Sequence, residues 1–236
     1  MLACSEGRRQ HGLHNMASDP TMIVSFSHNY IFIRTKKTAS STIETVLRNS
    51  LQPGDIAAGQ QTAQFKDDRN RRFDLNEKDL FAHMKAHDIR AGVSPEFWGG
   101  AFKFTSERHP YEKAVSLAFY RYGKRERIAA KKGRVLSEDF AVVLDQTVRT
   151  RLYRSFNFYA IDGQVVVDDF IRHENLAADL ERIGKRLNIV IPQQLPRKKT
   201  SYKLDERSAA EILSDKQKQI IHDTCREEFD LFGYRP

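Results

Sequence analysis

A short stretch of lysines and hydroxyl side chains is the part of the sequence best suited to chemistry. It follows an apolar run at residues 31–33 and comprises Lys36, Lys37, Thr38, Ala39, Ser40, Ser41 and Thr42. Apolar residues at helical spacing come next. Hydroxyls and backbone N–H groups at the start of a helix, beside a lysine, form a site for an anion such as phosphate. We therefore predict a buried strand, a tight loop and a helix that begins at an anion site. An ordinary helix cap with two surface lysines is the alternative.

A second stretch combines an arginine with a serine eight residues later. Arg108 follows the alternating residues 101–106, which predict a strand, and Pro110 suits the first turn of a helix. Ser116 then lies about two turns into that helix. An arginine at a strand end and a serine on the next helix can bind one phosphate from two sides. The alternative is a capping arginine with a packed serine.

Strands that alternate with helices must position these residues. We predict an α/β fold of the P-loop NTPase-like, three-layer type, with a central parallel sheet flanked by helices and ligands at its carboxyl edge. Residues 1–21 lack periodicity and are predicted to be a disordered leader before one domain at 22–236. Further predicted elements are a hairpin or two strands at 22–34, a strand at 165–171, and helices at 140–159, 176–187 and 208–231, the last ending at Gly233.

The composition describes a basic globular protein. The 236 residues are 40% hydrophobic and 30% charged, with a formal net charge of +8. A basic chain favours acidic partners such as nucleotides, anionic saccharides or nucleic acid. Two cysteines, no apolar run of membrane-spanning length and no signal-peptide pattern lead us to expect a cytoplasmic protein without stable membrane insertion.

The two motifs resemble those of sulfotransferases that use 3′-phosphoadenosine 5′-phosphosulfate (PAPS). Residues 37–42 are similar to the family's 5′-phosphosulfate loop, Pro-Lys-Thr-Ala/Gly-x-Thr/Ser, although Lys36 stands where the proline is usual. Arg108 and Ser116 match its 3′-phosphate motif. Residues 172–175 and 228–234 extend the resemblance, which covers roughly 31–234. The chain looks most similar to single-domain, bacterial-type members of the carbohydrate branch, which includes heparan and chondroitin enzymes.

This resemblance implies transfer of a sulfuryl group from PAPS to a hydroxyl of a saccharide or glycolipid, with no metal. Lys37 would stabilise the leaving oxygen, and the loop hydroxyls would hold the 5′-phosphate. The resemblance implies His83 as the general base, with His87 as the alternative, since histidine titrates near neutral pH. It also assigns Lys199 and Ser201 to a loop that covers the nucleotide. A solvent-exposed turn is the alternative for that loop.

Other functions compete with this interpretation. A P-loop nucleotide-binding kinase requires a glycine-rich loop, and no glycine occurs between residues 31 and 50. A basic nucleic-acid-binding protein without catalysis is the second alternative, although no nucleic-acid-binding module is recognised. A fold that binds the nucleotide without turnover is the third. The basic residues 121–134 predict a solvated helix end or, alternatively, a patch for an anionic acceptor.

Overall fold

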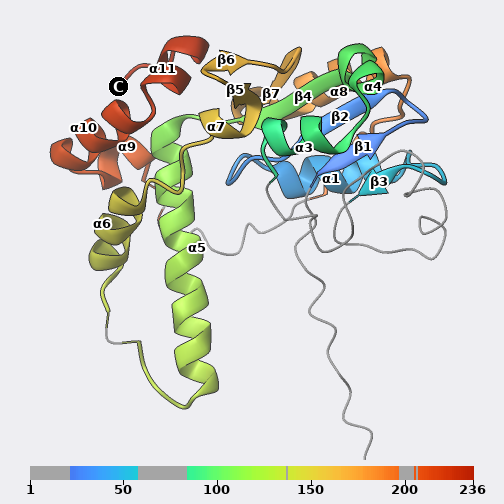
Figure 1. The fold of residues 1–236 in the computed structure, drawn as a ribbon. Coiled ribbons are helices and arrows are strands. Elements are labelled where there is room, and N and C mark those ends of the chain that lie inside the picture. The colour runs from blue at the N-terminus through green and yellow to red at the C-terminus, as the bar shows by residue number, and fades with distance from the viewer. Residues whose placement is uncertain (1–21, 58–83, 137, 197–204, 206) are drawn as a thin grey trace, which may run out of the picture.

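The computed structural model describes residues 22–57, 84–136, 138–196, 205 and 207–236 (Figure 1). The predicted leader at 1–21 lies outside these ranges. Within them, five strands form a mixed sheet in the order β3-β1-β2-β4-β7, and two short strands, β5 and β6, form a separate hairpin. The strands are β1 (Ile23–Ser25), β2 (Tyr30–Ile33), β3 (Ile56–Ala57), β4 (Phe102–Glu107), β5 (Ala160–Ile161), β6 (Gln164–Val165) and β7 (Asp169–Arg172).

Helices are interspersed with the strands along the chain. They are α1 (Ser40–Arg48), α3 (Ala86–Gly92), α4 (Pro95–Gly100), α5 (Pro110–Lys131), α6 (Phe140–Thr150), α7 (Phe156–Tyr159), the 3-10 turn η3 (His173–Asn175), α8 (Leu176–Leu187), α9 (Ala209–Ile212), α10 (Asp215–Thr224) and α11 (Arg226–Phe232). The strand-to-helix order predicted around the two motifs is confirmed, and Pro110 is the first residue of α5.

The central strands run parallel, but the sheet as a whole does not. β2 pairs with β4 and β4 with β7 in parallel register, so the carboxyl ends of all three lie at one edge. β1 is antiparallel to both β2 and β3. The connection from β1 to β2 is residues 26–29, which is too short for a parallel crossover. The predicted hairpin is therefore confirmed, and the predicted parallel sheet holds for β2, β4 and β7, whereas β1 and β3 make the sheet as a whole mixed.

Side-chain alternation explains the layers. In β2, Ile31 and Ile33 pack with Ile89 of α3 against one face, while Tyr30 and Phe32 pack with residues of α1 and α8 on the other. Successive strand residues point to opposite faces, so a strand with no polar residue must be covered on both sides. Helices accordingly cover both faces of the sheet.

A third hydrophobic cluster lies beside the sheet. It joins the first half of α5 to α6 and to α9, α10 and α11. The second half of α5 extends away from the sheet (Figure 1) and contains most of the basic residues 121–134. Lys124 and Arg127 are exposed there, and Arg125 pairs with Glu138. The prediction of a solvated helix end is confirmed.

One predicted strand is displaced. Residues 165–167, three valines, are only half-buried, and the paired strand β7 begins at Asp169. Asp162 and Gly163 have φ of 51° and 77° and turn the chain into the β5–β6 hairpin. Asp-Gly is a strong hairpin signal because both turn residues need positive φ. The apolar run alone predicts a strand from residue 165, but the Asp-Gly turn just before it places Val165 in the hairpin instead.

Two predicted helices are interrupted. The predicted helix at 140–159 divides into α6 and α7, because Arg151 adopts a left-handed conformation with φ of 54°. The predicted helix at 208–231 is three helices. Ser214 starts α10 with a capping box, its hydroxyl accepting from the Gln217 N–H. The helical region does end at Gly233, where φ is 61°. Among the described helices, none is long and apolar enough to cross a membrane.

Candidate functional site

The loop between β2 and α1 is tightly bent. Lys37 and Ala39 both have φ of 63°, a conformation that costs a non-glycine residue about 1–3 kcal/mol. Such strain is concentrated at binding sites, where the loop shape is needed. In the described part of the chain, the backbone N–H groups of Thr38, Ala39, Ser40 and Ser41 donate no hydrogen bond to another protein group. The loop thus offers several N–H donors at the start of α1.

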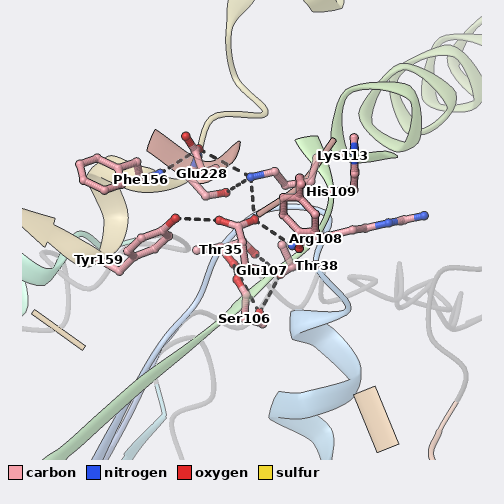
Figure 2. Close-up of polar contacts among 12 residues, drawn as sticks. Thr35, Thr38, Ser106, Glu107, Arg108, His109, Lys113, Phe156, Tyr159 and Glu228 are labelled. Carbon is pink, nitrogen blue, oxygen red and sulfur yellow. Dashed lines mark hydrogen bonds and ion pairs between the residues drawn. The ribbon is translucent and has the colours of Figure 1, made fainter. Parts of the chain in front are cut away.

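The loop hydroxyls brace the loop from behind. Thr38 Oγ1 lies 2.9 Å from Thr35 Oγ1 and 2.7 Å from Ser106 Oγ (Figure 2). Ser40 Oγ donates to the Thr35 carbonyl (2.9 Å). These contacts tie the loop to the end of β4. The predicted role of Thr38 and Ser40 in binding phosphate is therefore better suited to their backbone N–H groups than to their hydroxyls.

The two remaining hydroxyls, those of Thr42 and Ser41, differ in whether their protons are available to a ligand. Thr42 Oγ1 donates to the Pro196 carbonyl (2.9 Å), so its proton is used within the fold. Ser41 Oγ accepts from Arg34 Nη2 (2.7 Å), so its own proton can still be donated to a ligand. Ser41 is also less buried than Thr42. Of the four hydroxyls predicted to hold the 5′-phosphate, Ser41 is the one placed to donate directly.

The two lysines of the loop point to different neighbours. Lys37 Nζ lies 4.8 Å from the centre of the Tyr120 ring on α5. Lys36 Nζ lies 5.7 Å from the centre of the Phe158 ring on α7. Burial lowers the pKa of Lys36, because a half-buried ammonium loses part of its hydration. Lys37 therefore belongs to the side of the site that contains the second motif, and Lys36 does not.

The second motif is brought to the same edge of the sheet. Arg108 follows β4 directly, and its Nη2 donates to Glu112 Oε2 (2.7 Å). Glu112, Ser116 and Tyr120 are spaced four residues apart on α5, so they share one helix face, and all three are partly exposed. Because Lys37 lies over Tyr120, Ser116 occupies the turn between the Arg108–Glu112 pair and Lys37. Both predicted anion-binding motifs thus meet along one side of α5.

Arg108 lies among charged and polar groups from α5, η3 and the C-terminal residues. Burial lowers its pKa, while Glu112, Glu174 and Tyr234 oppose this effect. The neighbouring half-buried His173 has a lowered pKa, first because it is buried and then because Arg108 repels its charged form. The edge therefore keeps its positive charge on the arginine.

His109 has a structural role. Its Nδ1 accepts from the Tyr111 N–H (3.2 Å), and its Nε2 lies 3.0 Å from the Arg235 carbonyl, which it can reach only as a donor. The His109 N–H donates to Glu174 Oε1 (2.8 Å). Both ring nitrogens are thus used to begin α5 and to attach the C-terminal residues.

Of the two predicted general bases, the structure describes His87 but not His83. His83 lies outside the described residues, as do Lys199 and Ser201. His87, on α3, is 73% exposed, and its Nδ1 lies 3.5 Å from Asp88 Oδ1. Its helix starts near the loop, because Lys85 and Lys36 line one cavity. Among the described side chains, no cluster of His, Cys, Asp and Glu could hold a metal ion.

A buried ionic cluster, which the sequence-based prediction missed, lies directly behind this edge. Lys113 Nζ contacts Glu107 Oε1 at 2.6 Å, Ser155 Oγ at 3.1 Å and Glu228 Oε1 at 3.7 Å (Figure 2). Tyr159 Oη donates to Glu107 Oε2 (3.0 Å). We call Glu107, Lys113 and Glu228 the ionic triad. All three side chains are fully buried.

The triad links β4, α5 and α11. The N–H groups of Ser155 and Phe156 donate to Glu228 Oε1 (2.8 and 3.1 Å), which attaches the segment before α7 as well. Burial raises the pKa of Glu107, although Lys113 opposes this. Burial also opposes the charge on Lys113, but its two carboxylate partners outweigh that effect and its pKa is raised. The sequence did contain one signal of this cluster, because Lys113 interrupts the apolar face formed by Tyr111, Ala114, Val115 and Ala118.

No protein-family model, curated protein or solved structure matches this chain. A functional assignment therefore depends on the geometry of the edge formed by β2, β4 and β7.

Proposed function

We propose that this protein is a PAPS-dependent sulfotransferase with a P-loop NTPase-like fold, which sulfates a hydroxyl of a saccharide or glycolipid. The observation that carries the proposal is the meeting of two anion-binding motifs along α5. The loop at 36–42 supplies N–H donors and places Lys37 against Tyr120 of α5, while Arg108 lies just before the start of α5 and Ser116 lies on that helix. A nucleotide with phosphates on both its 5′ and 3′ positions needs two such places.

Sulfuryl transfer asks the protein mainly for positioning and charge stabilisation, as phosphoryl transfer does. The bond between sulfur and the bridging phosphate oxygen breaks, and that oxygen keeps the electron pair. Lys37 stabilises the negative charge that develops on it. A bond forms between sulfur and the acceptor oxygen, whose proton passes to a histidine, either His83 or His87. This chemistry requires no metal ion.

The donor site is tested by calorimetric titration with 3′,5′-diphosphoadenosine, the nucleotide product, against ATP. We expect tight binding that does not need magnesium and that prefers the 3′-phosphate. Arg108→Ala should weaken it about 10- to 100-fold, the range expected for a lost charged hydrogen bond. Arg149→Ala is the matched control, because that arginine is 72% exposed on α6 and its ion pair among the described residues is a local one, with Asp145. Equal affinity for ATP, or a strict need for magnesium, would point to a kinase instead.

The transfer step is tested with radiolabelled PAPS and a panel of saccharides. His83→Ala and His87→Ala distinguish the two candidate bases, and loss of the true base should slow transfer about 10²- to 10⁴-fold. Tight nucleotide binding with no transfer to any saccharide would favour a binding protein. Salt-dependent binding to DNA without binding to 3′,5′-diphosphoadenosine would contradict the donor site altogether.

A further inference from the structure

A cavity of about 400 Å³ lies on the Lys36 side of the loop, away from the face of α5 that contacts Lys37. Its volume falls within the roughly 300–1,000 Å³ range of small-molecule sites. Four segments form its wall: the loop after β2, the residue before α3, the connection from α6 to α7, and the junction of α10 and α11. The lining residues with polar or aromatic groups include Lys36, Lys85, Arg151, Arg154, Asn157 and Phe158.

The charges of this cavity are unbalanced. Two lysines and two arginines line it, against the carboxylates of Asp223 and Glu227. Glu227 Oε1 is occupied by Arg154 Nη2 (2.6 Å), and Asp223 Oδ1 accepts from the amide of Gln219 (3.0 Å) on its own helix. Arg154 Nε is buried and has no hydrogen-bond partner among the described residues. An anion in the cavity would therefore meet an excess of positive charge, because four cationic side chains face two carboxylates that already accept hydrogen bonds.

Lys36 adds to the excess of positive charge in the cavity. Burial lowers its pKa, so its charged form is held at a cost that a bound anion would offset. Its Nζ lies beside the Phe158 ring, whose half-buried face belongs to the cavity wall. An aromatic face next to cations and an amide, Asn157, suits a ring that has an apolar face and polar edges. A pyranose with an acidic substituent has those features.

The position of the cavity relates it to the transfer site. Lys36 and Lys37 are adjacent in the loop, and their side chains diverge toward Phe158 and Tyr120. If Lys37 lies at the transferred group, the Lys36 side is where an acceptor approaches. We infer that this cavity binds the acidic part of a saccharide acceptor, with its carboxylate at Arg151 and Arg154 and its ring on Phe158; this inference rests on the function proposed above.

The test compares two tetrasaccharides by calorimetry and as acceptors. One alternates glucuronate with N-acetylglucosamine, and the other is the uncharged tetramer of N-acetylglucosamine. The wild type should bind the acidic probe at least tenfold more tightly. Arg151→Gln should remove most of that preference without changing the affinity for 3′,5′-diphosphoadenosine. Arg149→Gln, two residues away and outside the cavity lining, should change neither affinity.

The outcomes separate the cavity from the donor site. Equal or undetectable binding of the two probes, or an Arg151→Gln effect of equal size on both, overturns the cavity assignment even if the nucleotide binds. Arg151-dependent binding of the acidic probe without nucleotide binding supports the cavity as an acidic-saccharide site and removes the proposed donor. As acceptors, the probes should differ mainly in KM, because the carboxylate is distant from the reacting atoms.

Discussion

Ser106 and Glu107 are neighbours at the end of β4, yet their side chains enter two different electrostatic environments. Ser106 Oγ contacts Thr38 in the loop at 36–42, where two lysines are partly exposed and several N–H groups donate to no other described group. Glu107 contacts Lys113 in the ionic triad, where every side chain is fully buried. Adjacent strand residues point to opposite sides, which is how one strand end serves both regions.

The difference separates two uses of charge. In the triad, each charged group meets its partners within the fold, so the charges hold α5 and α11 against β4 and offer little to a ligand. In the loop, the hydroxyls of Thr38, Ser40 and Thr42 are used within the fold, while the Ser41 hydroxyl proton and several backbone N–H groups are not, and two lysines are partly exposed. Substitutions in the triad should therefore change stability, and substitutions in the loop should change ligand binding and turnover. The predictions below test that separation.

Lys113→Met should produce the largest change in stability. The substitution preserves most of the side-chain volume but leaves Glu107 and Glu228 as buried carboxylates without their cation. Removing one partner of a buried ion pair costs about 3–5 kcal/mol. Urea unfolding should show a loss of that size, with unchanged nucleotide affinity in the folded fraction. Lys124→Met, at an exposed position on the same helix, is the control.

A double variant sharpens this test. Glu107→Gln in the Lys113→Met background removes one of the two uncompensated carboxylates, and it should recover part of the lost stability. If instead Lys113→Met unfolds no more easily than Lys124→Met, the triad does not stabilise the fold and the comparison fails.

Lys37→Met should have the largest effect on function. The variant keeps the hydrophobic part of the side chain near Tyr120 but removes the charge. Loss of one group that stabilises developing negative charge typically lowers turnover about 10²- to 10³-fold. The unfolding midpoint should stay within the range of the Lys124→Met control. A large drop in stability with normal turnover would assign Lys37 to the structural side of the comparison.

Local sequence signals predicted the loop side well. An apolar strand, a run of hydroxyl residues and an apolar helical pattern occur in direct succession, so the order of strand, loop and helix in residues 31–48 follows from neighbours in the chain, although the left-handed backbone of Lys37 and Ala39 does not. Pro110 fixed the start of α5 in the same way. The turn at Asp162–Gly163 and the capping box at Ser214 are equally local signals, and they indicate the β5–β6 hairpin and the start of α10, which the prediction did not include.

The ionic triad could not be predicted in the same way. Glu107 and Glu228 are 121 residues apart in the sequence, and only packing α11 against β4 brings them together. Lys113 in an apolar helix face indicates a buried partner but does not identify it. The left-handed Arg151 is a similar case, since nothing in its residue type favours that conformation.

His173, at the carboxyl edge of the sheet, should be uncharged near neutral pH. Burial and Arg108 lower the pKa of this histidine from its ordinary value of 6.5. Below pH 6.5 the unfolded chain therefore binds a proton that the folded protein does not. Stability falls as the pH drops from 6.5 toward the folded pKa, by at most about 1.4 kcal/mol per pH unit. His173→Gln should reduce this slope in urea unfolding, and His87→Gln should not.

Nucleotide binding extends the same prediction. A 3′-phosphate beside Arg108 would favour the charged form of His173 and raise its pKa, which NMR titration of the ring would detect. A His173 pKa above 6.5 in the nucleotide-free protein would mean that negative charge dominates this edge. That result would contradict the cationic character we assign to it.

Ser106→Ala should have the smallest effect, because it removes the contacts of the Ser106 hydroxyl with Thr38 Oγ1 (2.7 Å) and Thr35 Oγ1 (3.3 Å) but leaves Thr38 another partner. Thr38 Oγ1 keeps Thr35 at 2.9 Å, so the cost should be about 0.5–1.5 kcal/mol, that of an ordinary hydrogen bond. Combined with Lys113→Met, the two losses should add within about 0.5 kcal/mol if the regions are independent. A coupling above 1 kcal/mol would mean that the triad sets the loop's geometry through β4. In that case Lys113→Met would also weaken nucleotide binding, and charge at this strand end would act as a single network.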